Sequence, residues 1–344
     1  MSVGLDIGAS RIRCVRRRGE QLIGRNARAQ FTALPDAPNY RSLLEAGRIP
    51  FAVCDNALTI LGDNAAAYAS LFHVRPQTLM PQGRLPMNDP VARQSLAALV
   101  EALLGEPDQP GEICGVSLPG GEVFQSSVIN HELEYLSRLI RLRGFTPMVL
   151  SAGMAVILSA GVRDSFTAIG LSFGAATSEL VLVHRGVQRA IFSIPRGGNW
   201  MDERIAEHFD LTQCTESGEH FFDLPQAASF RQSFVGNLLQ PGTDEERFLA
   251  DLHFYLTDSL IRGAANELGC NLPVLKIPQP LPVIAIGGVA RIRGFEELLR
   301  HCFLAARFPL TIREFRLATS DDYAVARGCL INAELGAETQ SHAA

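Results

Sequence analysis

Three glycine-containing turns, each directly after a short apolar run, constrain the fold of this chain more than any other feature. They lie in VGLDIGAS, AIGLSFGAATSE and VIAIGGVARIRGFEELL, at residues 3–10, 168–179 and 283–299. An apolar run bounded by small residues predicts a buried strand that ends in a tight turn. Backbone N–H groups in such a turn can face inward and bind phosphate where the side chains are small. A single turn of this kind is weak evidence, so the prediction of a phosphate site rests on all three.

A strand–turn–strand pattern occurs twice, which indicates a weak internal duplication. The first copy covers Val3–Arg16 and the second covers Phe166–His184. The length of 344 residues suits two packed lobes better than one.

Hydrophobic periodicity predicts the remaining elements. Strands are expected at residues 3–7, 11–16, 21–27, 50–53, 57–61, 113–118, 147–150, 166–171, 178–184 and 282–286. Helices are expected at residues 65–71, 89–104, 131–143, 154–161, 295–305 and 323–335, and residues 200–262 are expected to be mainly helical.

Composition narrows the class of protein. The net charge of −5 argues against a nucleic-acid binder that works through a general basic surface. A Walker-type phosphate loop is excluded, because its GxxxxGK[ST] pattern needs a lysine and the single lysine, Lys276, lies in VLKIPQP. The seven cysteines are scattered and form no CxxC pair, which predicts reduced thiols and no zinc site. With no signal-peptide pattern and no apolar run of the roughly 20 residues that span a bilayer, we expect a cytoplasmic protein.

The three turns together resemble the motifs of the actin-like ATPase superfamily, and specifically those of bacterial actins of the MreB and MamK types. GLDIGAS resembles the first phosphate motif, SFGAATSE the second (normally DIGGGTTE), and IGGVARIRG the adenosine motif. Three further segments, ALTILGDNAAAYASLFHVRPQTLMPQGRL, SIPRGGNWMDERIAEHF and DDYAVARGCLINAEL, resemble family segments in the same order. The resemblance covers nearly the whole chain.

The resemblance implies an α/β, two-lobed actin-like fold, in which each lobe is a duplicated mixed sheet flanked by helices and the nucleotide cleft lies between the lobes. It places lobe I at residues 1–148, with a small insertion at about 31–72, and lobe II at 149–321, with a helical insertion at about 203–265. A closing helix at 322–336 returns to lobe I, and residues 337–344 form a disordered tail.

The same resemblance implies ATP or ADP as the ligand, with Mg²⁺ as an optional ion held by Asp6. Glu219 is the weakest of the implied contacts, because GEHFF matches the family poorly. The implied nucleotide-binding residues are Asp6, Gly8, Ala9, Ser10, Gly174, Ala175, Ala176, Thr177, Glu219, Gly287, Gly288 and Val289.

Two departures from the family pattern bear on hydrolysis. Ser172 stands where the second phosphate motif has an aspartate that helps to hold Mg²⁺, an ion that prefers anionic oxygen. Ala152 stands where the family has a glutamate that positions the attacking water, and alanine cannot orient water or accept its proton. We therefore expect hydrolysis to be slow or lost. The alternative is that Glu179 or another carboxylate has taken over the role.

The leading hypothesis is a bacterial actin-like protein that binds adenine nucleotide and polymerises with itself into filaments, since a heterologous contact that does not close gives an open filament. A non-polymerising pseudo-ATPase adaptor is the alternative, and a sugar or acetate kinase of the same fold ranks third. A chaperone of this fold is disfavoured because no peptide-binding segment follows the final helix.

Two surface features complete the predictions. The loop GEPDQPGE, at residues 105–112, is polar and acidic, and the chain starts directly in its first strand, so direct membrane binding is not expected. The basic run Arg16–Arg18 is interpreted as a solvated hairpin edge, with a filament or partner contact as the other reading.

Overall fold

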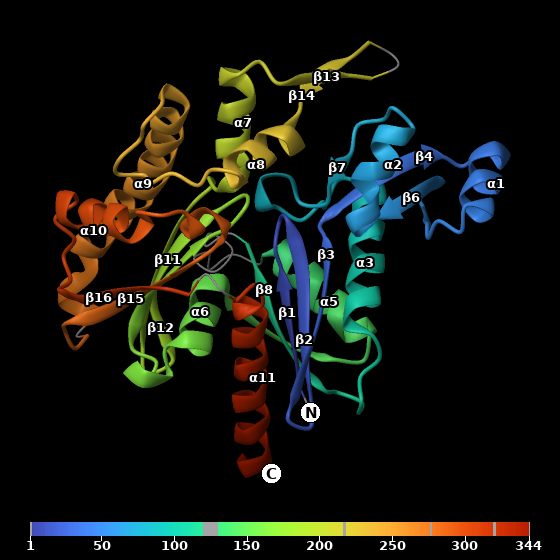
Figure 1. Ribbon diagram of the computed structural model, residues 1–344. Helices are drawn as coiled ribbons and strands as arrows, with labels where there is room; N and C mark the ends of the chain where they lie inside the picture. The colour runs from blue at the N-terminus through green and yellow to red at the C-terminus, as the bar shows by residue number, and fades with distance from the viewer. Residues whose placement is uncertain (1, 120–129, 216–217, 276, 319–320, 344) are drawn as a thin grey trace.

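Two five-stranded sheets with the same strand order form the centre of the molecule. The computed structural model describes residues 2–119, 130–215, 218–275, 277–318 and 321–343. The sheets have the orders β3-β2-β1-β8-β9 and β12-β11-β10-β15-β16. We call the parts built on them the first and second lobe, and they lie side by side in Figure 1.

Each sheet begins as an antiparallel meander and continues with two parallel strands. In the first lobe the strands are β1 Ser2–Ile7, β2 Arg11–Arg18, β3 Gln21–Arg28, β8 Ile113–Leu118 and β9 Thr146–Ser151. In the second they are β10 Ala168–Phe173, β11 Ser178–His184, β12 Val187–Ile194, β15 Leu281–Ile286 and β16 Ile312–Leu317. β1 pairs antiparallel with β2 and parallel with β8, and β10 pairs in the same way with β11 and β15. The duplication indicated by the sequence is therefore present in the fold.

Helices cover the outer face of each sheet, because the central strands β1, β8, β10 and β15 are buried along their whole length. α3 Pro90–Leu104 and α5 His131–Leu142 pack on the first sheet, and α9 Asp244–Leu275 and α10 Phe295–Ala305 pack on the second. α3 starts where the Asp89 carboxylate accepts a hydrogen bond from the Ala92 N–H and ends at Gly105, which has a φ of 66°. Both residues satisfy the backbone groups that a helix end leaves open.

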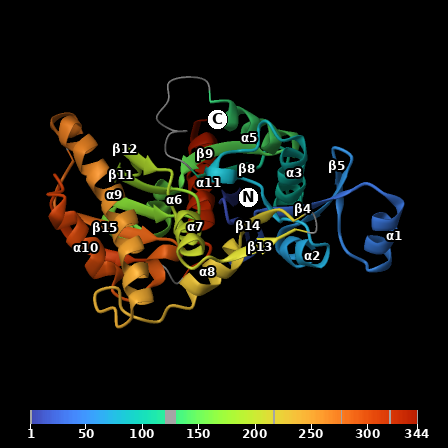
Figure 2. The same cartoon turned by 90° about the horizontal axis from the view of Figure 1, so that it is seen from above.

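α6 Ala152–Ala160 and α11 Ala324–Ala343 lie between the two sheets (Figure 2). Small residues allow this close approach. A Cβ atom at Gly328 of α11 would lie 1.9 Å from the Ala155 carbonyl oxygen of α6, and one at Gly4 of β1 would lie 2.0 Å from the Ala326 carbonyl oxygen. The inner helices thus connect the lobes through backbone-to-backbone contact.

Each lobe carries an insertion after its third strand. The first contains β4 Gln30–Pro35, α1 Pro38–Ala46, β5 Ala52–Cys54, β6 Ala57–Leu61, α2 Ala65–Leu71 and β7 Gln77–Thr78. The second contains α7 Gly198–His208, β13 Thr212–Cys214, β14 His220–Phe222 and α8 Leu224–Gln232 before α9. Short 3₁₀ turns occur at Gly62–Asn64, Pro81–Gly83, Val162–Asp164 and Gly288–Arg291.

The fold class implied by the resemblance is confirmed, and several local predictions are wrong. Residues 200–262 are mainly helical, as predicted, although the β13–β14 hairpin, which the prediction omitted, interrupts the helices. The prediction also omitted β4, α1, β12 and β16. The disordered tail expected from residue 337 is helical as far as Ala343, because α11 continues. None of the described helices is long and apolar enough to cross a membrane.

Candidate functional site

The turns after β1 and β10 are closed by the same hydrogen bond. The Gly8 N–H donates to the Arg11 carbonyl at 3.1 Å, and the Gly174 N–H donates to the Thr177 carbonyl at 2.9 Å. A Cβ atom would lie 2.7 Å from the Arg11 oxygen at Gly8 and 2.9 Å from the Thr177 oxygen at Gly174. Only glycine fits either position without a shift of the backbone. The two turns are thus one local structure made twice, once in each lobe.

The second turn is held by the start of α7. The Gly198 N–H donates to the Gly174 carbonyl at 3.0 Å, and the Asn199 N–H donates to the Ala175 carbonyl at 2.7 Å. In a trans peptide the C=O and the N–H point in opposite directions, so the N–H groups of Ala175 and Ala176 point away from α7. Within the described chain no backbone carbonyl accepts a hydrogen bond from either group. Backbone N–H groups in such a turn can bind an anion.

The first turn offers a similar arrangement. Ala9 is buried and Ser10 is exposed, and the Ser10 carbonyl accepts a hydrogen bond from the Ala29 N–H at 2.9 Å. No backbone carbonyl of the described residues accepts from the N–H of Ala9 or Ser10. Both turns therefore present small side chains together with N–H groups that no backbone carbonyl of the described residues accepts.

Asp6 is held from both neighbouring strands at the end of β1. The Ser117 hydroxyl of β8 donates to Asp6 Oδ1 at 2.9 Å, and Arg13 Nη1 of β2 lies 3.6 Å from Asp6 Oδ2. The register of the sheet aligns Asp6 with both residues. Burial raises the pKa of Asp6 above its ordinary value, and the Arg13 charge and the Ser117 hydrogen bond offset part of the rise.

Glu179 of β11 is a second buried carboxylate, and it contacts the first turn of α6. It is only 2% exposed, and its Oε1 atom accepts a hydrogen bond from the Gly153 N–H. Its Oε2 atom has no hydrogen-bond partner among the described residues. Burial raises the pKa of Glu179 to about 7, the Gly153 N–H lowers it, and the Asp6 charge raises it further. The fold thus brings a carboxylate next to Ala152, the position at which the family has its glutamate.

Ser172, the other departure from the family pattern, lies opposite Glu179 in the register of β10 and β11. Its side chain is buried, at 9% exposure, and it carries no charge. Glu179 was considered from the sequence only as a substitute carboxylate. A single acidic residue followed by apolar Leu180 and Val181 is the signal in the sequence that it points inward.

The third turn differs from the other two. Gly287 has a φ of 121°, and a Cβ atom there would lie 2.0 Å from the Phe173 carbonyl oxygen, so the position requires glycine. A Cβ atom at Gly288 would meet no atom within 4 Å, so this residue borders open space. Val289 is 2% exposed and packs in the core of the second lobe, so only its backbone is available to a ligand.

The tip of the second turn reaches the first lobe. Ala176 packs in the core of the first lobe, although it belongs to the second. A Cβ atom at Gly83, in the turn Pro81–Gly83, would lie 3.1 Å from Thr177 Cγ2 and 3.2 Å from Ala176 Cβ. The described contacts therefore place the two lobes directly against each other at this turn.

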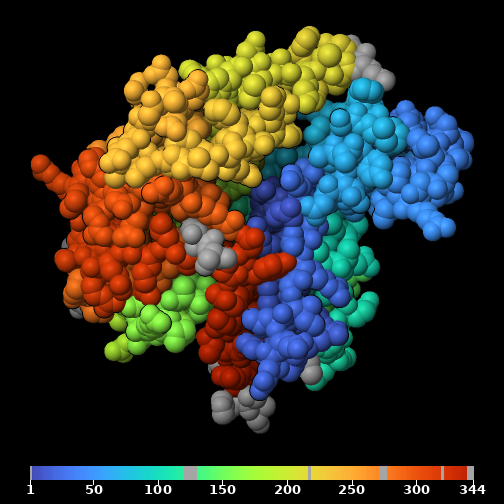
Figure 3. Space-filling view, viewed as in Figure 1, coloured from blue at the N-terminus to red at the C-terminus, as the bar shows by residue number. Residues whose placement is uncertain are grey.

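A second contact between the lobes lies at the top of the molecule in Figure 3, where the β13–β14 hairpin meets the first insertion. The Arg75 guanidinium of that insertion lies 5.5 Å from the centre of the Phe221 ring in β14. Glu219 belongs to the connection of this hairpin, where it is exposed and its N–H donates to Thr215 Oγ1 at 3.1 Å. This hairpin lies at the top of the molecule in Figure 1.

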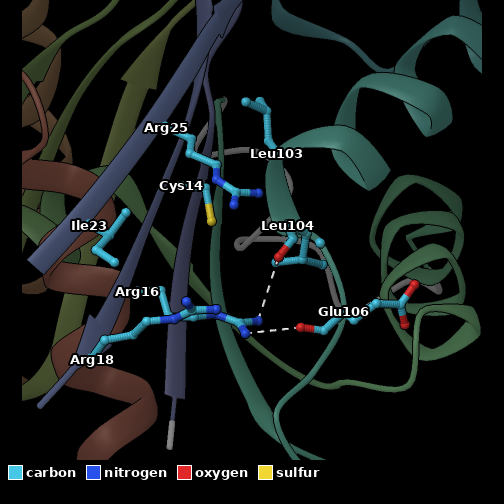
Figure 4. A pocket seen from close by; sticks show the side chains of 9 residues that line it. Cys14, Arg16, Arg18, Ile23, Arg25, Leu103, Leu104 and Glu106 are labelled. Carbon is cyan, nitrogen blue, oxygen red and sulfur yellow. Dashed lines mark hydrogen bonds between the residues drawn. The ribbon is translucent and has the colours of Figure 1, made fainter.

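A separate hollow lies between the first sheet and the end of α3 (Figure 4). Arg16 points into it and donates to the Glu106 carbonyl at 2.9 Å, and it lies 3.7 Å from Glu112 Oε2. The interpretation of Arg16 as part of a solvated edge is wrong, because its side chain is buried, whereas Arg17 and Arg18 are exposed. The lining residues are Cys14, Arg16, Arg18, Ile23, Arg25, Leu103, Leu104, Gly105 and Glu106.

The described cysteines and potential metal ligands form no metal site. Cys14, Cys54, Cys114, Cys302 and Cys329 are buried free thiols, and burial raises the pKa of Cys14 to about 11. Among the described residues no group of three or more His, Cys, Asp or Glu side chains is arranged to hold a metal ion. Lys276, the single lysine, lies outside the described residues.

Solved structures of bacterial actins resemble this chain over nearly its full length. The MamK double helical filament has a TM-score of 0.66 and 16% identity, covering 96% of this chain and 98% of that chain. MreB5 of Spiroplasma citri bound to AMPPNP has a TM-score of 0.66 and 17% identity, covering 99% and 98%. The ethanolamine utilization protein EutJ from Carboxydothermus hydrogenoformans has a TM-score of 0.50 and 15% identity, covering 96% and 89%. At these identities the likeness shows the fold alone.

The comparison of sequences gives the family. The sequence has no significant match among curated proteins. A family model described as Volactin matches residues 1–333. Because that match covers nearly the whole chain and the fold is that of the actin-like proteins, this protein belongs to the Volactin family.

Proposed function

We propose that this chain is an actin-like cytoskeletal protein that binds adenine nucleotide between its lobes, polymerises with itself in the cytoplasm and hydrolyses ATP slowly or not at all. The observation that carries the proposal is the pair of matching turns at Gly8 and Gly174, after which the N–H groups donate to no backbone carbonyl of the described residues. MreB5 is similar in fold and is known bound to AMPPNP and to ADP, and MamK is known as a filament.

The described residues fit a nucleotide. Ala9, Ser10, Ala175 and Ala176 present N–H groups with small side chains, which suits a phosphate chain. Gly288 borders open space on the second lobe, which suits the adenosine. The residues proposed to contact the nucleotide are Asp6, Gly8, Ala9, Ser10, Gly174, Ala175, Ala176, Thr177, Gly287, Gly288 and the backbone of Val289.

Slow hydrolysis is expected because the two carboxylates of the bacterial-actin pattern are replaced here by Ala152 and Ser172. Ala152 has no group that could orient water, and Ser172 has no charge. Glu179 lies close to both, but one of its oxygens already accepts the Gly153 N–H. A bound ATP would therefore persist, and filaments would turn over slowly because phosphate release could not weaken their contacts.

The test combines sedimentation, electron microscopy and phosphate release on one sample of purified protein with ATP. Filaments that form with nucleotide and release little phosphate support the proposal. Rapid phosphate release contradicts the hydrolysis part alone. A protein that stays monomeric at high concentration with ATP contradicts polymerisation and supports the second candidate, a non-polymerising adaptor.

A further inference from the structure

The fold family implies a Mg²⁺ ion beside the nucleotide phosphates, and the described residues do not fit one. Mg²⁺ needs near-octahedral oxygen coordination and is usually bound by one or two carboxylates together with phosphates and water. The candidate positions in this chain are Asp6 at the end of β1 and residue 172 at the end of β10. The second is a serine, so Asp6 would have to supply the negative charge.

Asp6 is already engaged at both oxygens. Ser117 donates to Oδ1 at 2.9 Å, and the Arg13 guanidinium lies 3.6 Å from Oδ2. A divalent cation placed beside this carboxylate would also lie close to the fixed positive charge of Arg13, and like charges repel strongly in a site with little water. Asp6 is therefore a partner of Arg13 rather than a free ligand.

Glu179 does not replace the missing ligand. Its Oε1 accepts the Gly153 N–H, which leaves Oε2 as its only free oxygen. A single oxygen is short of the carboxylate pair that the family uses, and the opposite residue in the register is the neutral Ser172. No other carboxylate of the described chain completes a cluster at this place.

Arg13 has the properties of a phosphate ligand. Its side chain is 24% exposed and lies on the same face of the sheet as Asp6, two residues beyond the Gly8–Arg11 turn. Among the described residues its one ion pair is with Asp6, whereas Arg11 and Arg28 pair with Asp63 and Arg291 pairs with Asp322. A guanidinium has five donors, so Arg13 can keep Asp6 and still donate to a phosphate.

We propose that this chain binds its nucleotide without Mg²⁺, and that Arg13, held in place by Asp6, supplies the positive charge opposite the phosphates. The inference rests on the proposed nucleotide binding. It adds that the counter-charge is part of the polypeptide, so the bound form is the free nucleotide anion rather than its magnesium complex.

The experiment is a fluorescence titration of the full-length protein with N-methylanthraniloyl-ATP, in excess EDTA and in excess Mg²⁺. We expect the two dissociation constants to agree within about threefold, because no ligand set for the ion is present. Arg13→Gln should weaken binding in EDTA by at least about tenfold, since it removes a charge-assisted hydrogen bond to the phosphates. Arg13→Lys should retain an intermediate affinity, because it keeps the charge but loses the planar fork.

Arg28→Gln is the matched control, because Arg28 is an exposed arginine on the adjacent strand that pairs with Asp63. Its affinity should equal that of the unchanged protein. The double variant Arg13→Gln, Ser172→Asp frees Asp6 and adds the missing carboxylate, so its binding should become dependent on Mg²⁺. Thermal unfolding of every variant verifies that it is folded.

The outcomes separate the two proposals. Loss of binding in EDTA, with binding restored by Mg²⁺, overturns the present inference and leaves nucleotide binding intact. Equal binding by the Arg13→Gln variant and the unchanged protein also overturns it. Absence of binding in both solutions overturns the proposed function itself, and the inference with it.

Discussion

The backbone N–H of Gly153 donates a hydrogen bond to the buried carboxylate of Glu179, and this bond joins the first turn of α6 to β11 beneath the second glycine turn. A Cβ atom at Gly153 would lie 2.5 Å from Val181 Cγ2, so the helix can come this close only with glycine there. The contact gives the second lobe a buried, titratable group next to Ala152.

Glu179→Gln should make the stability of the protein less dependent on pH. The folded pKa of about 7 lies above the ordinary value of 4.5, so between these values the unfolded chain loses the proton while the folded chain keeps it. The contribution of Glu179 to the free energy of unfolding is therefore complete below pH 4.5 and is lost as the pH rises toward 7. At pH 8 the variant should be more stable by roughly 1–3 kcal/mol, because an uncharged amide replaces a buried anion.

Urea unfolding of both proteins between pH 5 and pH 8 measures this. The charge of Asp6 raises the pKa of Glu179, so Asp6→Asn is a useful companion variant that should lower that pKa. Parallel stability curves for the unchanged protein and Glu179→Gln would contradict the assignment.

Ala152→Glu should increase phosphate release from ATP. Ala152 is half-buried at the first position of α6. A glutamate there restores the group that positions water in the bacterial-actin pattern. A positioned general base typically contributes about 10²–10⁴-fold, and a tenfold gain over the unchanged protein is a conservative expectation. A coupled phosphate-release assay measures it. Ala160→Glu, half-buried at the other end of the same helix, is the control and should show no gain.

Gly288→Leu should block nucleotide binding and leave the fold intact. A Cβ atom at Gly288 meets no atom within 4 Å, so the leucine extends into the space assigned to the adenosine. The affinity for N-methylanthraniloyl-ATP should fall by at least about tenfold, which corresponds to 1.4 kcal/mol. Gly269→Leu, on the exposed side of α9 and equally open, should bind normally. Normal binding by both variants would place the nucleotide elsewhere.

Gly328→Ala should destabilise the protein far more than Gly336→Ala in the same helix. At Gly328 the new Cβ atom would lie 1.9 Å from the Ala155 carbonyl oxygen, and neither helix can move without separating the lobes. At Gly336 the nearest atom is Met148 Cε, the end of a flexible side chain. Both changes gain the same helix propensity of about 1 kcal/mol. We expect a loss of roughly 2–4 kcal/mol at Gly328 and a change within about 1 kcal/mol at Gly336, measured by urea unfolding. Similar values for the two variants would show that the helices adjust freely.

Phe221→Ala should speed the release of nucleotide. The ring lies under the Arg75 guanidinium, and a partly exposed cation–π contact contributes about 0.5–1 kcal/mol to holding the lobes together. Stopped-flow displacement of the fluorescent nucleotide should show a rise in the dissociation rate of about two- to fivefold. Phe222→Ala, the next residue on the opposite face of β14, should leave the rate unchanged, and an equal rise there would assign the effect to the hairpin as a whole.

The resemblance of its motifs to those of bacterial actins implied the two-lobed fold, and the sequence by itself determined the strands and the three turns. These follow from local patterns: apolar runs set the strands, and a glycine stands where Gly8, Gly174 and Gly287 each approach a carbonyl too closely for a Cβ atom. For several elements the predicted and observed bounds are identical, among them β8 Ile113–Leu118, β11 Ser178–His184 and α10 Phe295–Ala305.

Tertiary structure alone decided which side chains meet. Arg13 reaches Asp6 because the β1–β2 register aligns them, and Arg16 is buried because α3 ends beside it, which its basic neighbours do not indicate. Glu219 lies in the connection of a short hairpin, which the helical periodicity does not predict. Periodicity reports which face of an element is apolar, whereas the charge balance of a site depends on residues far apart in the chain, whose positions are set only when the sheets and helices pack.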